Sequence, residues 1–430
     1  MKGKIKNFAE LAMNKDRKTA LLVMEAGLKA IDTATLMKKN FRLQKNALKI
    51  KEQKISLQSG GRILAVGVGK CSYKAAMVLE NILGERLEGG VVVDTRVGDG
   101  LKKIRALQGD HPMPSEWNIN AAGEIIAKLS GLKKEDLVIM IISGGGSTML
   151  CQPQNLTCQE ETKILSCLFK EGASIKEINT VRKHVSLARG GYLAQYAYPA
   201  KVVSLIFSDV PGNNLEFVAS GPTFRDNTGI GEAKAVLKKY AVEEKSGISE
   251  IRLLETPKDE KYFSQVKNIL FASNKLALSA MAREAERRGL SAKIVNETLV
   301  GEVRQTGAEI LRELRQQDPK KVLLFGGETT VLVKGEGRGG RNQEMALALL
   351  PAVESEEMVI TMASDGCDNT DSAGAICDII TRHKAEKKGM NSAEFLAQNN
   401  SYEFFKETGD FLLTGPTGSN VSDLIAAFKF

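Results

Sequence analysis

The sequence contains few of the residues that most often build metal centres and nucleic-acid platforms. Its 430 residues include three histidines, one tryptophan and six cysteines, and aromatic side chains make up 5% of the chain. The cysteines form no C-x-x-C pair, so we predict reduced thiols and neither a zinc centre nor a disulfide framework. Because no DNA- or RNA-binding motif is present either, nucleic acid is not expected as a partner.

Long apolar segments are also missing. No run of about eighteen apolar residues occurs, and the opening residues, Met1-Lys-Gly-Lys-Ile-Lys, lack the apolar stretch of a signal peptide. We therefore predict a soluble, cytoplasmic protein that has no membrane partner. With 43% hydrophobic residues, the chain is long enough for two hydrophobic cores, because single cores stop growing at roughly 250–300 residues.

An excess of one charge is present, but it is not concentrated in one segment. The net charge is +8, from 60 basic and 52 acidic residues that are interleaved along the chain. Interleaved charges are typical of a solvated surface, and a modest positive excess favours anionic small molecules as substrates.

Short apolar strands alternate with helical segments along most of the chain. The first predicted strands span residues 63–66, 90–94, 137–142 and 202–207. Alternation at this spacing predicts a largely parallel sheet with helices on both faces. A charged stretch at residues 226–263 then separates a second set, which we predict to begin with a strand at 268–272. Residues 326–344 read as a turn, an antiparallel return strand and a glycine-rich loop, so we predict a mixed second sheet.

Turns rich in glycine, serine and threonine follow several of these strands and precede helices. The clearest examples occupy residues 63–70, 137–147, 358–366 and 411–420. Backbone N–H groups that glycines free at a helix start bind anions, and turns at the carboxyl ends of parallel strands converge. The pattern predicts a cleft that handles phosphate groups.

The first of these turns, Gly67-Val-Gly69-Lys70, can be compared with two nucleotide-binding motifs. A dinucleotide fingerprint would need a third glycine at Ser72, although Asp94 after the next strand imitates its ribose-binding acid. The Walker motif fails because a single residue separates the two glycines. What remains is the lysine, whose compact charge can hold a phosphoryl group during transfer.

Two other glycine-rich segments are candidates for phosphate binding. The run Ser143-Gly-Gly-Gly-Ser147 directly follows an apolar strand and is predicted to cradle phosphates. Arg338 and Arg341 lie in a loop whose glycines, residues 335–340, we expect to be mobile without ligand and to close over a phosphoryl group. We assign phosphate or nucleotide binding to Ser143, Gly144, Gly145, Gly146, Ser147, Gly326, Gly327 and Glu328.

Acidic and basic side chains complete the predicted site. Asp209 and Asp365 follow strands, where a carboxylate suits a magnesium ion or a substrate hydroxyl, or equally a helix N-cap. The basic run Arg182-Lys-His184 fits an anion pocket, although an unpaired histidine is more often structural. We assign metal binding to Asp209 and Asp365, and substrate binding to Arg182, His184 and Asn342.

Motifs along the chain resemble those of the class II glycerate kinases, the glycerate 2-kinases whose C-terminal half is called the MOFRL domain. The motifs include Asp110-His-Pro-Met-Pro, Ile142-Ser-Gly-Gly-Gly-Ser, Asn179-Thr-Val-Arg-Lys-His, Ser208-Asp-Val-Pro-Gly, Gly340-Arg-Asn-Gln-Glu and Leu413-Thr-Gly-Pro-Thr-Gly-Ser-Asn-Val. The resemblance covers nearly the whole chain. It implies a Rossmann-like α/β domain at residues 1–235 and a smaller MOFRL-type α/β domain with a mixed sheet at 236–430, with the active site in the cleft between them.

The resemblance also implies a reaction and the groups that carry it. The family's catalytic lysine falls on Lys70, and its essential arginine falls on Arg341. ATP and a divalent cation such as Mg²⁺ are the implied partners in the phosphorylation of D-glycerate at its 2-hydroxyl to give 2-phosphoglycerate. A homodimer is left open.

Two other interpretations stay open. Relatives of this family carry the name hydroxypyruvate reductase, and an NAD(P)-dependent enzyme of that kind would use Gly67, Gly69 and Asp94. A non-catalytic anion-binding protein is the other interpretation, although several converging turns with a lysine and arginines exceed what binding requires. Offering the protein glycerate with ATP, or hydroxypyruvate with NADH, separates the three.

Overall fold

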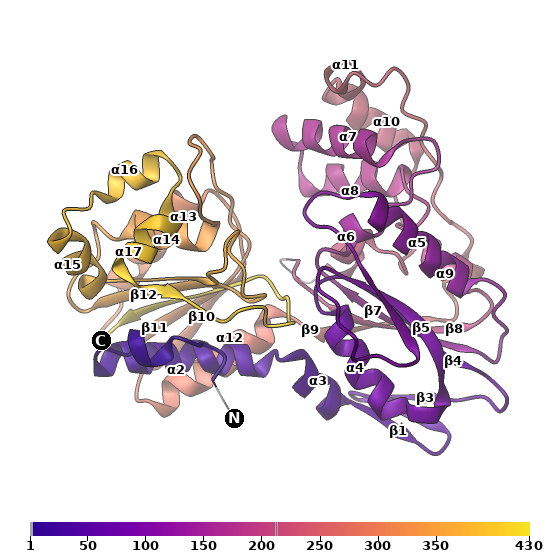
Figure 1. Ribbon diagram of the computed structural model, residues 1–430, viewed down its shortest axis with the longest axis horizontal. Coiled ribbons are helices and arrows are strands. Elements are labelled where there is room, and N and C mark those ends of the chain that lie inside the picture. Colours follow the sequence, from indigo (N-terminus) through magenta and orange to yellow (C-terminus); the bar gives the residue numbers. More distant parts are fainter. Residues whose placement is uncertain (1–2, 211, 213) are drawn as a thin grey trace. The chain divides into compact units, whose positions relative to one another are not determined.

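The chain forms two compact units, and the computed structural model describes residues 3–210, 212 and 214–430 (Figure 1). The parallel-sheet unit comprises Thr33–Ser208 and Asn214–Phe271. The mixed-sheet unit comprises Met1–Asp32, Asp209–Asn213 and Ala272–Phe430. The predicted α/β fold, with one parallel and one mixed sheet, is confirmed.

The six strands of the main sheet in the parallel-sheet unit span Ile104–Gln108 (β6), Leu87–Asp94 (β5), Ile63–Val68 (β4), Leu137–Ser143 (β7), Lys201–Phe207 (β8) and Val266–Ala272 (β9), in this spatial order. β4 pairs in parallel with β5 and β7, β5 pairs in parallel with β6, and β7 with β8. β4 and β7 are apolar and buried along their whole length, as a central strand between two helical layers requires. Their carboxyl ends lead into the glycine-rich turns.

Helices cover this sheet (Figure 1). They span Ser72–Leu83 (α4), Glu116–Leu129 (α5), Gly146–Met149 (α6) and Tyr192–Ala197 (α9). α4 packs on β4, β5 and β7, whereas α5 packs on β5 and β6 and also contacts α9. Helix Thr33–Asn40 (α3) contacts α4, and a small antiparallel sheet follows it, with strands Phe41–Gln44 (β1), Ala47–Ile50 (β2) and Gln53–Ser56 (β3).

A group of helices in the same unit has a hydrophobic core of its own. It consists of Cys158–Lys170 (α7), Ile175–His184 (α8), Ile230–Lys239 (α10) and Val242–Ser246 (α11) (Figure 1). Ile164, Val181 and Leu237 belong to this core. α8 begins at a capping box in which Ser174 and Glu177 satisfy each other's backbone N–H groups. The cap and the core together fix the side chains that α8 presents.

The sheet of the mixed-sheet unit contains Ser291–Leu299 (β10), Lys321–Gly327 (β11), Asp423–Lys429 (β15), Glu357–Ala363 (β12), Gly374–Asp378 (β13) and Phe411–Leu412 (β14), in this spatial order. β10 and β11 are parallel, and the other neighbours are antiparallel. The prediction of an antiparallel return strand shortly after residue 326 is wrong. The strand that pairs antiparallel with β11 is β15, near the C-terminus. The reason is apolarity, because β15 is buried along nearly its whole length whereas Leu332 and Val333 are exposed.

Helices cover this second sheet as well. They span Phe8–Leu11 (α1), Lys15–Ala30 (α2), Asn274–Arg287 (α12), Val303–Arg315 (α13), Arg341–Leu349 (α14), Ile379–Lys387 (α15), Ser392–Ala397 (α16) and Ser401–Thr408 (α17). α2 packs along α12 and contacts β15, while α13 and α14 pack on each other and α14 on β12 and β13 (Figure 1). Buried Arg17 of α2 pairs with Asp378 and Asp410, each at 2.7 Å.

The two units are bounded differently from the expected domains at residues 1–235 and 236–430. The N-terminal helices belong to the mixed-sheet unit, because α2 packs on α12 and its Arg17 is neutralised there. At the other boundary, the parallel-sheet unit continues to Phe271. The strand expected to open the second set is β9, which lies at the edge of the first sheet, where Phe271 packs against Phe207 with ring centroids 5.2 Å apart.

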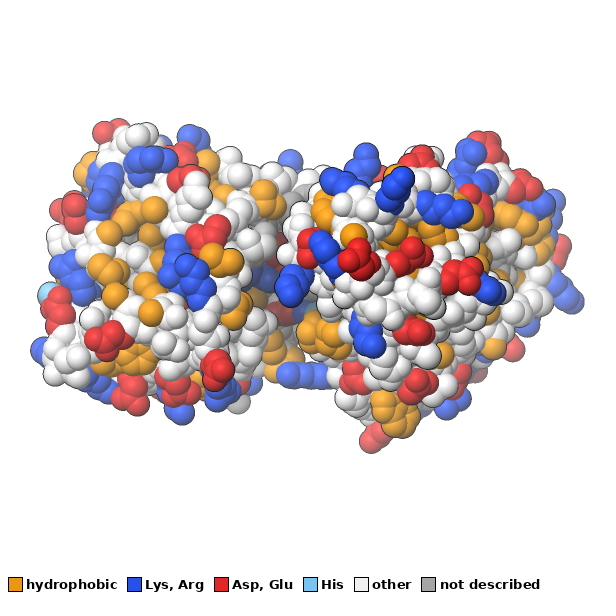
Figure 2. All heavy atoms as spheres, turned by 90° about the horizontal axis from the view of Figure 1, so that it is seen from above, with side chains coloured by type: hydrophobic (Ala, Val, Ile, Leu, Met, Phe, Trp, Pro, Cys, Tyr) orange, Lys and Arg blue, Asp and Glu red, His pale blue; other side chains and the backbone are white. Residues whose placement is uncertain are grey.

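Charged side chains of both signs are interspersed on the face drawn in Figure 2. Such mixing is typical of a solvated surface. Within the described parts of the chain, no helix is both long and apolar enough to cross a membrane.

Candidate active site

Two of the predicted phosphate-binding turns are in direct contact in the parallel-sheet unit. Gly69 follows β4 with a φ of +109°, and a Cβ atom there would lie 2.4 Å from the carbonyl oxygen of Ser143. The backbone N–H of Lys70 donates to the carbonyl of Gly144 at 3.0 Å, and that of Cys71 donates to Ser143 Oγ at 3.3 Å. A glycine is therefore required at position 69 to bring the lysine turn onto the Ser143–Ser147 turn.

Lys70 lies over the middle of this second turn. Gly145 has a φ of +82°, and a Cβ atom added there would lie 3.2 Å from Lys70 Cγ and 3.3 Å from His111 Cδ2. The lysine stem and the ring of His111 thus flank the same glycine. The turn that sequence predicted as a phosphate cradle and the lysine predicted to act on a phosphoryl group are brought together.

Asp94, the residue that imitates a ribose-binding acid, has a different role. Its Oδ2 accepts a hydrogen bond of 3.0 Å from the N–H of Tyr73, in the first turn of α4. Burial raises the pKa of Asp94 to about 6, against the lowering effect of this backbone hydrogen bond. Ser72, where the fingerprint needs glycine, donates from its hydroxyl to the carbonyl of Val93 at 2.7 Å. Both contacts fix the start of α4 and count against a dinucleotide site.

A strained bend supports the second serine of the cradle. Ala219 and Ser220 have φ values of +52° and +58°, a conformation that costs of order 1–3 kcal/mol in a non-glycine residue. The hydroxyl of Ser220 lies 2.8 Å from that of Ser147 and donates to Asn179 Oδ1 at 2.8 Å. The bend therefore positions Ser220 between Ser147 and Asn179, and the three side chains form a hydrogen-bonded chain behind the cradle.

A buried ion pair that sequence reasoning missed holds the same turn. Arg189 is fully buried and pairs with Glu161 at 2.7 Å. Its Nε donates to the carbonyl of Ser147 at 2.8 Å, and its Nη1 donates to that of Arg182 at 3.3 Å. The motif Val185-Ser-Leu-Ala-Arg189 was visible in the sequence, but its partner on α7 follows only from the fold.

The basic residues at the end of α8 have unequal surroundings. Lys183 Nζ lies 3.3 Å from Asp226 Oδ1. His184 is fully buried, and its Nδ1 lies 2.7 Å from the carbonyl of Thr180. The burial of His184 favours the structural interpretation, and its predicted contact with substrate stays a prediction.

Arg341 and Glu328 are brought together in the mixed-sheet unit. Arg341 opens α14, and its guanidinium lies 2.8 Å from Glu328 and donates through Nη2 to Asp423 Oδ1 at 3.0 Å. Burial alone would lower the pKa of Arg341, but the two carboxylates outweigh it and raise that pKa. Glu328, predicted to bind nucleotide or phosphate, thus orients the arginine. Asp423 was not predicted, although it stands just after the motif that ends at Val421.

The start of α14 is anchored by another acid, three residues after Asp365. Asp368 is buried and accepts from the backbone N–H groups of Asn342 at 3.1 Å and Gln343 at 2.8 Å. Burial raises the pKa of Asp368 to about 6. The side-chain amide of Asn342 also donates to it at 3.1 Å. Asn342 is thereby engaged within the protein, and its substrate role stays a prediction.

The two predicted metal ligands lie beside the segment that precedes β15. Asp209 Oδ2 accepts from the amide of Asn420 at 3.0 Å. Ser364 accepts through Oγ from the N–H of Val421 at 2.9 Å, and Asp365, the next residue, accepts through Oδ1 from the N–H of Cys367 at 3.0 Å. Within the described residues, no cluster of three or more histidine, cysteine or acidic side chains forms a ready metal centre.

The other predicted glycines allow close packing. Gly326 and Gly327 end β11, and a Cβ on Gly327 would lie 2.1 Å from the carbonyl oxygen of Leu299 in β10. In the loop expected to be mobile, a Cβ on Gly337 would lie 2.4 Å from the carbonyl oxygen of Gln398, which accepts the N–H of Gly337 at 2.8 Å. Close packing of strand on strand at Gly327, and of loop on loop at Gly337, is enough to require glycine. Phosphate binding at Gly326 and Gly327 and mobility of the loop stay predictions.

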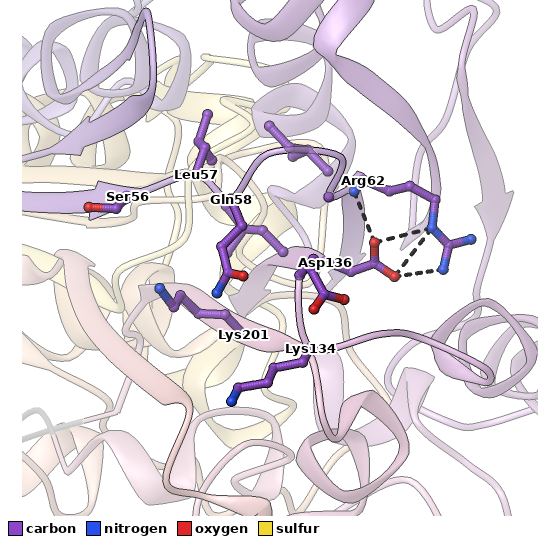
Figure 3. Close-up of a pocket in the computed structure, with 11 residues that line it drawn as sticks. Ser56, Leu57, Gln58, Arg62, Lys134, Asp136 and Lys201 are labelled. Atoms are coloured by element: carbon purple, nitrogen blue, oxygen red, sulfur yellow. Dashed lines mark hydrogen bonds and ion pairs between the residues drawn. The ribbon is translucent and has the colours of Figure 1, made fainter.

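A pocket at the amino ends of β4, β7 and β8 lies at the opposite end of the parallel sheet from the glycine-rich turns (Figure 3). In its lining, Arg62 pairs with Asp136 at 2.6 Å, and this contact lowers the pKa of Asp136 to about 2. The pair ties together the starts of two strands. We assign it a structural role.

Comparisons with known proteins show the family of this chain. A domain of unknown function (DUF4147) matches residues 19–255, and the MOFRL family matches residues 321–423. A glycerate 2-kinase of Pyrococcus horikoshii is 38% identical over 95% of this chain and 98% of its own. A putative hydroxypyruvate reductase of Agrobacterium vitis is 37% identical over 85% of this chain and 87% of its own.

A solved structure extends the comparison to three dimensions. The crystal structure of a glycerate kinase from Thermotoga maritima superposes with a TM-score of 0.80 and 33% identity, over 96% of this chain and 99% of that one. The α/β fold and these relatives place the chain among the phosphotransferases. The chain belongs to the class II glycerate kinases, the MOFRL family.

Proposed function

We propose that this protein is an ATP-dependent glycerate 2-kinase, which phosphorylates D-glycerate at its 2-hydroxyl. The observation that carries the proposal is Lys70, held on the Ser143–Ser147 turn in a chain that is 38% identical to a glycerate 2-kinase over nearly its full length. Phosphoryl transfer needs positioning and charge stabilisation more than covalent chemistry. The Lys70 ammonium and the backbone N–H groups of the turn supply both.

Lys70 would neutralise the transferring phosphoryl group, and the Ser143–Ser147 turn would cradle the phosphates. The ammonium is a compact point charge, and the turn already meets it at Gly145. The donors would be in place before the reaction, so little reorganisation is needed in the transition state.

Arg341 would stabilise the charge of a transferring phosphoryl group. Its guanidinium is oriented by Asp423 and Glu328, so that little side-chain freedom is lost when it meets an anion. Neither carboxylate removes its charge, because the pKa of Arg341 is raised. We propose that Arg341, like Lys70, stabilises phosphoryl charge during transfer.

Mg²⁺ is the cation that we propose for Asp209 and Asp365. Both offer the hard oxygen ligands that Mg²⁺ prefers, and this ion is often bound by one or two protein carboxylates together with substrate phosphates and water. When bound, the ion would neutralise phosphate charge. An alternative role for either carboxylate is to accept a hydrogen bond from the substrate hydroxyl.

Incubation of the purified protein with two substrate pairs tests the proposal. With D-glycerate, ATP and Mg²⁺, ADP should form. With hydroxypyruvate and NADH, absorbance of NADH should stay constant, because Ser72 and Asp94 are used to fix α4. Consumption of NADH without formation of ADP would favour the reductase, and consumption of neither would favour an anion-binding protein. A cytoplasmic location and a homodimer stay predictions.

A further inference from the structure

The three consecutive basic residues at the end of α8 differ in how their charge is balanced. Lys183 pairs with Asp226 at 3.3 Å, and His184 has Asp226 and Glu255 within 3.9 Å and 3.6 Å of its Nε2. Within the described part of the chain, the guanidinium of Arg182 has no hydrogen-bond or ion-pair partner, and its Nε is sealed from solvent. Arg182 thus carries the uncompensated charge.

Such a charge is costly to keep. Burial lowers the pKa of Arg182 to about 10, and the neighbouring Arg189 adds repulsion. Glu161 offsets part of this repulsion, but it is already paired with Arg189 at 2.7 Å. Partly buried ionised groups are normally paired, because an unpaired one loses hydration without compensation. An anion bound to Arg182 would supply the missing compensation.

Two independent contacts place Arg182 beside the phosphate cradle. Asn179 lies three residues earlier on α8, so both side chains share one side of the helix, and Asn179 receives the hydroxyl of Ser220, which lies 2.8 Å from Ser147. In addition, Arg189 donates both to the carbonyl of Arg182 and to that of Ser147. The cradle and Arg182 are therefore held by the same network.

We propose that Arg182 binds the carboxylate of glycerate. This assignment rests on the proposed kinase function. A planar guanidinium can hold a carboxylate through two parallel hydrogen bonds, and among the described residues the nearby acid, Glu161, pairs with Arg189 and not with Arg182. The phosphates of ATP already have Lys70 and the cradle turn, whereas Lys183 and His184, the basic neighbours of Arg182, already face Asp226.

The test compares glycerate with its neutral amide, glyceramide, in wild-type protein and in Arg182→Gln. The variant should raise the KM for glycerate at least about tenfold, as loss of hydrogen bonds to a charged group does, and leave the KM for ATP unchanged. The preference of the wild-type protein for glycerate over glyceramide should largely disappear. Lys176→Gln, which removes an exposed charge from the same helix, is the matched control and should keep that preference.

Thermal unfolding separates a ligand-binding role from a structural one. Because the Arg182 side chain has no hydrogen-bond or ion-pair partner among the described residues, Arg182→Gln should fold and have the same Tm as the wild-type protein or a higher one. A lower Tm or a failure to fold would assign Arg182 to the structure and overturn the proposal. An unchanged KM for glycerate would overturn it as well, and a rise in the KM for ATP alone would reassign the residue to phosphate.

The outcome for Arg182 is distinguishable from that for the kinase reaction. If the wild-type protein forms no ADP with glycerate, the proposed function fails whatever the variant does. If the wild-type protein is active and Arg182→Gln matches it, only the carboxylate assignment fails. Calorimetric titration compares the affinity of the wild-type protein and of Arg182→Gln for glycerate without turnover. Equal affinities would contradict the proposal.

Discussion

Lys70 and Arg341 are held in different ways, and this difference determines how each is tested. Lys70 extends from a turn that contacts the Ser143–Ser147 turn through its backbone. Arg341 is oriented by its side chain, through Glu328 and Asp423. A substitution of Lys70 therefore removes a charge and leaves the turn intact, whereas a substitution of Arg341 also releases two carboxylates.

We expect Lys70→Ala to lower kcat at least about 100-fold with little change in Tm, because a pre-organised charge on a transferring group is worth roughly 3 kcal/mol or more. Lys70→Arg should also be poor, since a planar fork does not replace a compact ammonium. Lys134→Ala, an exposed lysine at the opposite end of the sheet, is the control and should be fully active. Near-normal turnover of Lys70→Ala would remove this lysine from the mechanism.

Arg341→Lys should lower kcat and kcat/KM by similar factors and leave the KM for glycerate little changed, because an interaction made only in the transition state is lost. Steady-state kinetics with varied glycerate measures this. Arg312→Lys, which changes an exposed arginine of α13, is the control. A large rise in KM with normal kcat would instead make Arg341 a substrate clamp.

At the scale of elements, the contact between the two glycine-rich turns is the feature that shapes the site. We expect Gly69→Ala to lower the free energy of unfolding by about 2 kcal/mol or more, because the new Cβ would lie 2.3 Å from Ser143 Oγ and 2.4 Å from its carbonyl oxygen. Turnover per folded molecule should also fall, since Lys70 is displaced from the cradle. Denaturant unfolding and turnover are the measurements.

Gly131→Ala is the matched control for backbone conformation. Gly131 has a φ of +70°, but no atom lies within 4 Å of the position of a Cβ. This variant should lose only the cost of the left-handed conformation, about 1–2 kcal/mol, and keep its activity. If Gly69→Ala behaved like Gly131→Ala, the close approach of the two turns would not matter for function.

Much of this element structure follows from the sequence, because its signals are local. A buried apolar strand, a glycine turn and an amphipathic helix predict α4 and both turns around Lys70 correctly. The residues that support the site could not be predicted in the same way. Arg189, Glu161 and Asp423 act through partners far along the chain, and ordinary charged residues become site residues only when the fold buries them together.

At the scale of the whole molecule, sequence predicted two sheets and their types but not how the chain is shared between them. Local alternation does not show that β15 pairs with β11 or that β9 lies beside β8. Nor does it show that an N-terminal helix belongs to the mixed-sheet unit. These assignments depend on apolar faces and charges that meet only in three dimensions.

The assignment of α2 to the mixed-sheet unit predicts a selective loss of stability. Arg17→Met leaves Asp378 buried without its ion-pair partner, which typically costs about 3–5 kcal/mol, whereas Asp410 keeps Lys384 at 2.8 Å. Amide hydrogen exchange should become faster in β12 and β13 and stay unchanged in β4 and β7. Lys18→Met, an exposed neighbour on the same helix, is the control. Equal acceleration in both units would contradict the division.

The position of the new phosphate on the product tests the central claim most directly. D-glycerate, ATP, Mg²⁺ and the wild-type protein are incubated, and the product is examined by proton and phosphorus NMR. A glycerate 2-kinase predicts coupling of the new phosphorus signal to the single proton on C2, and loss of that signal in Lys70→Ala. Coupling to the two protons on C3, or no phosphorylated glycerate at all, would contradict the account.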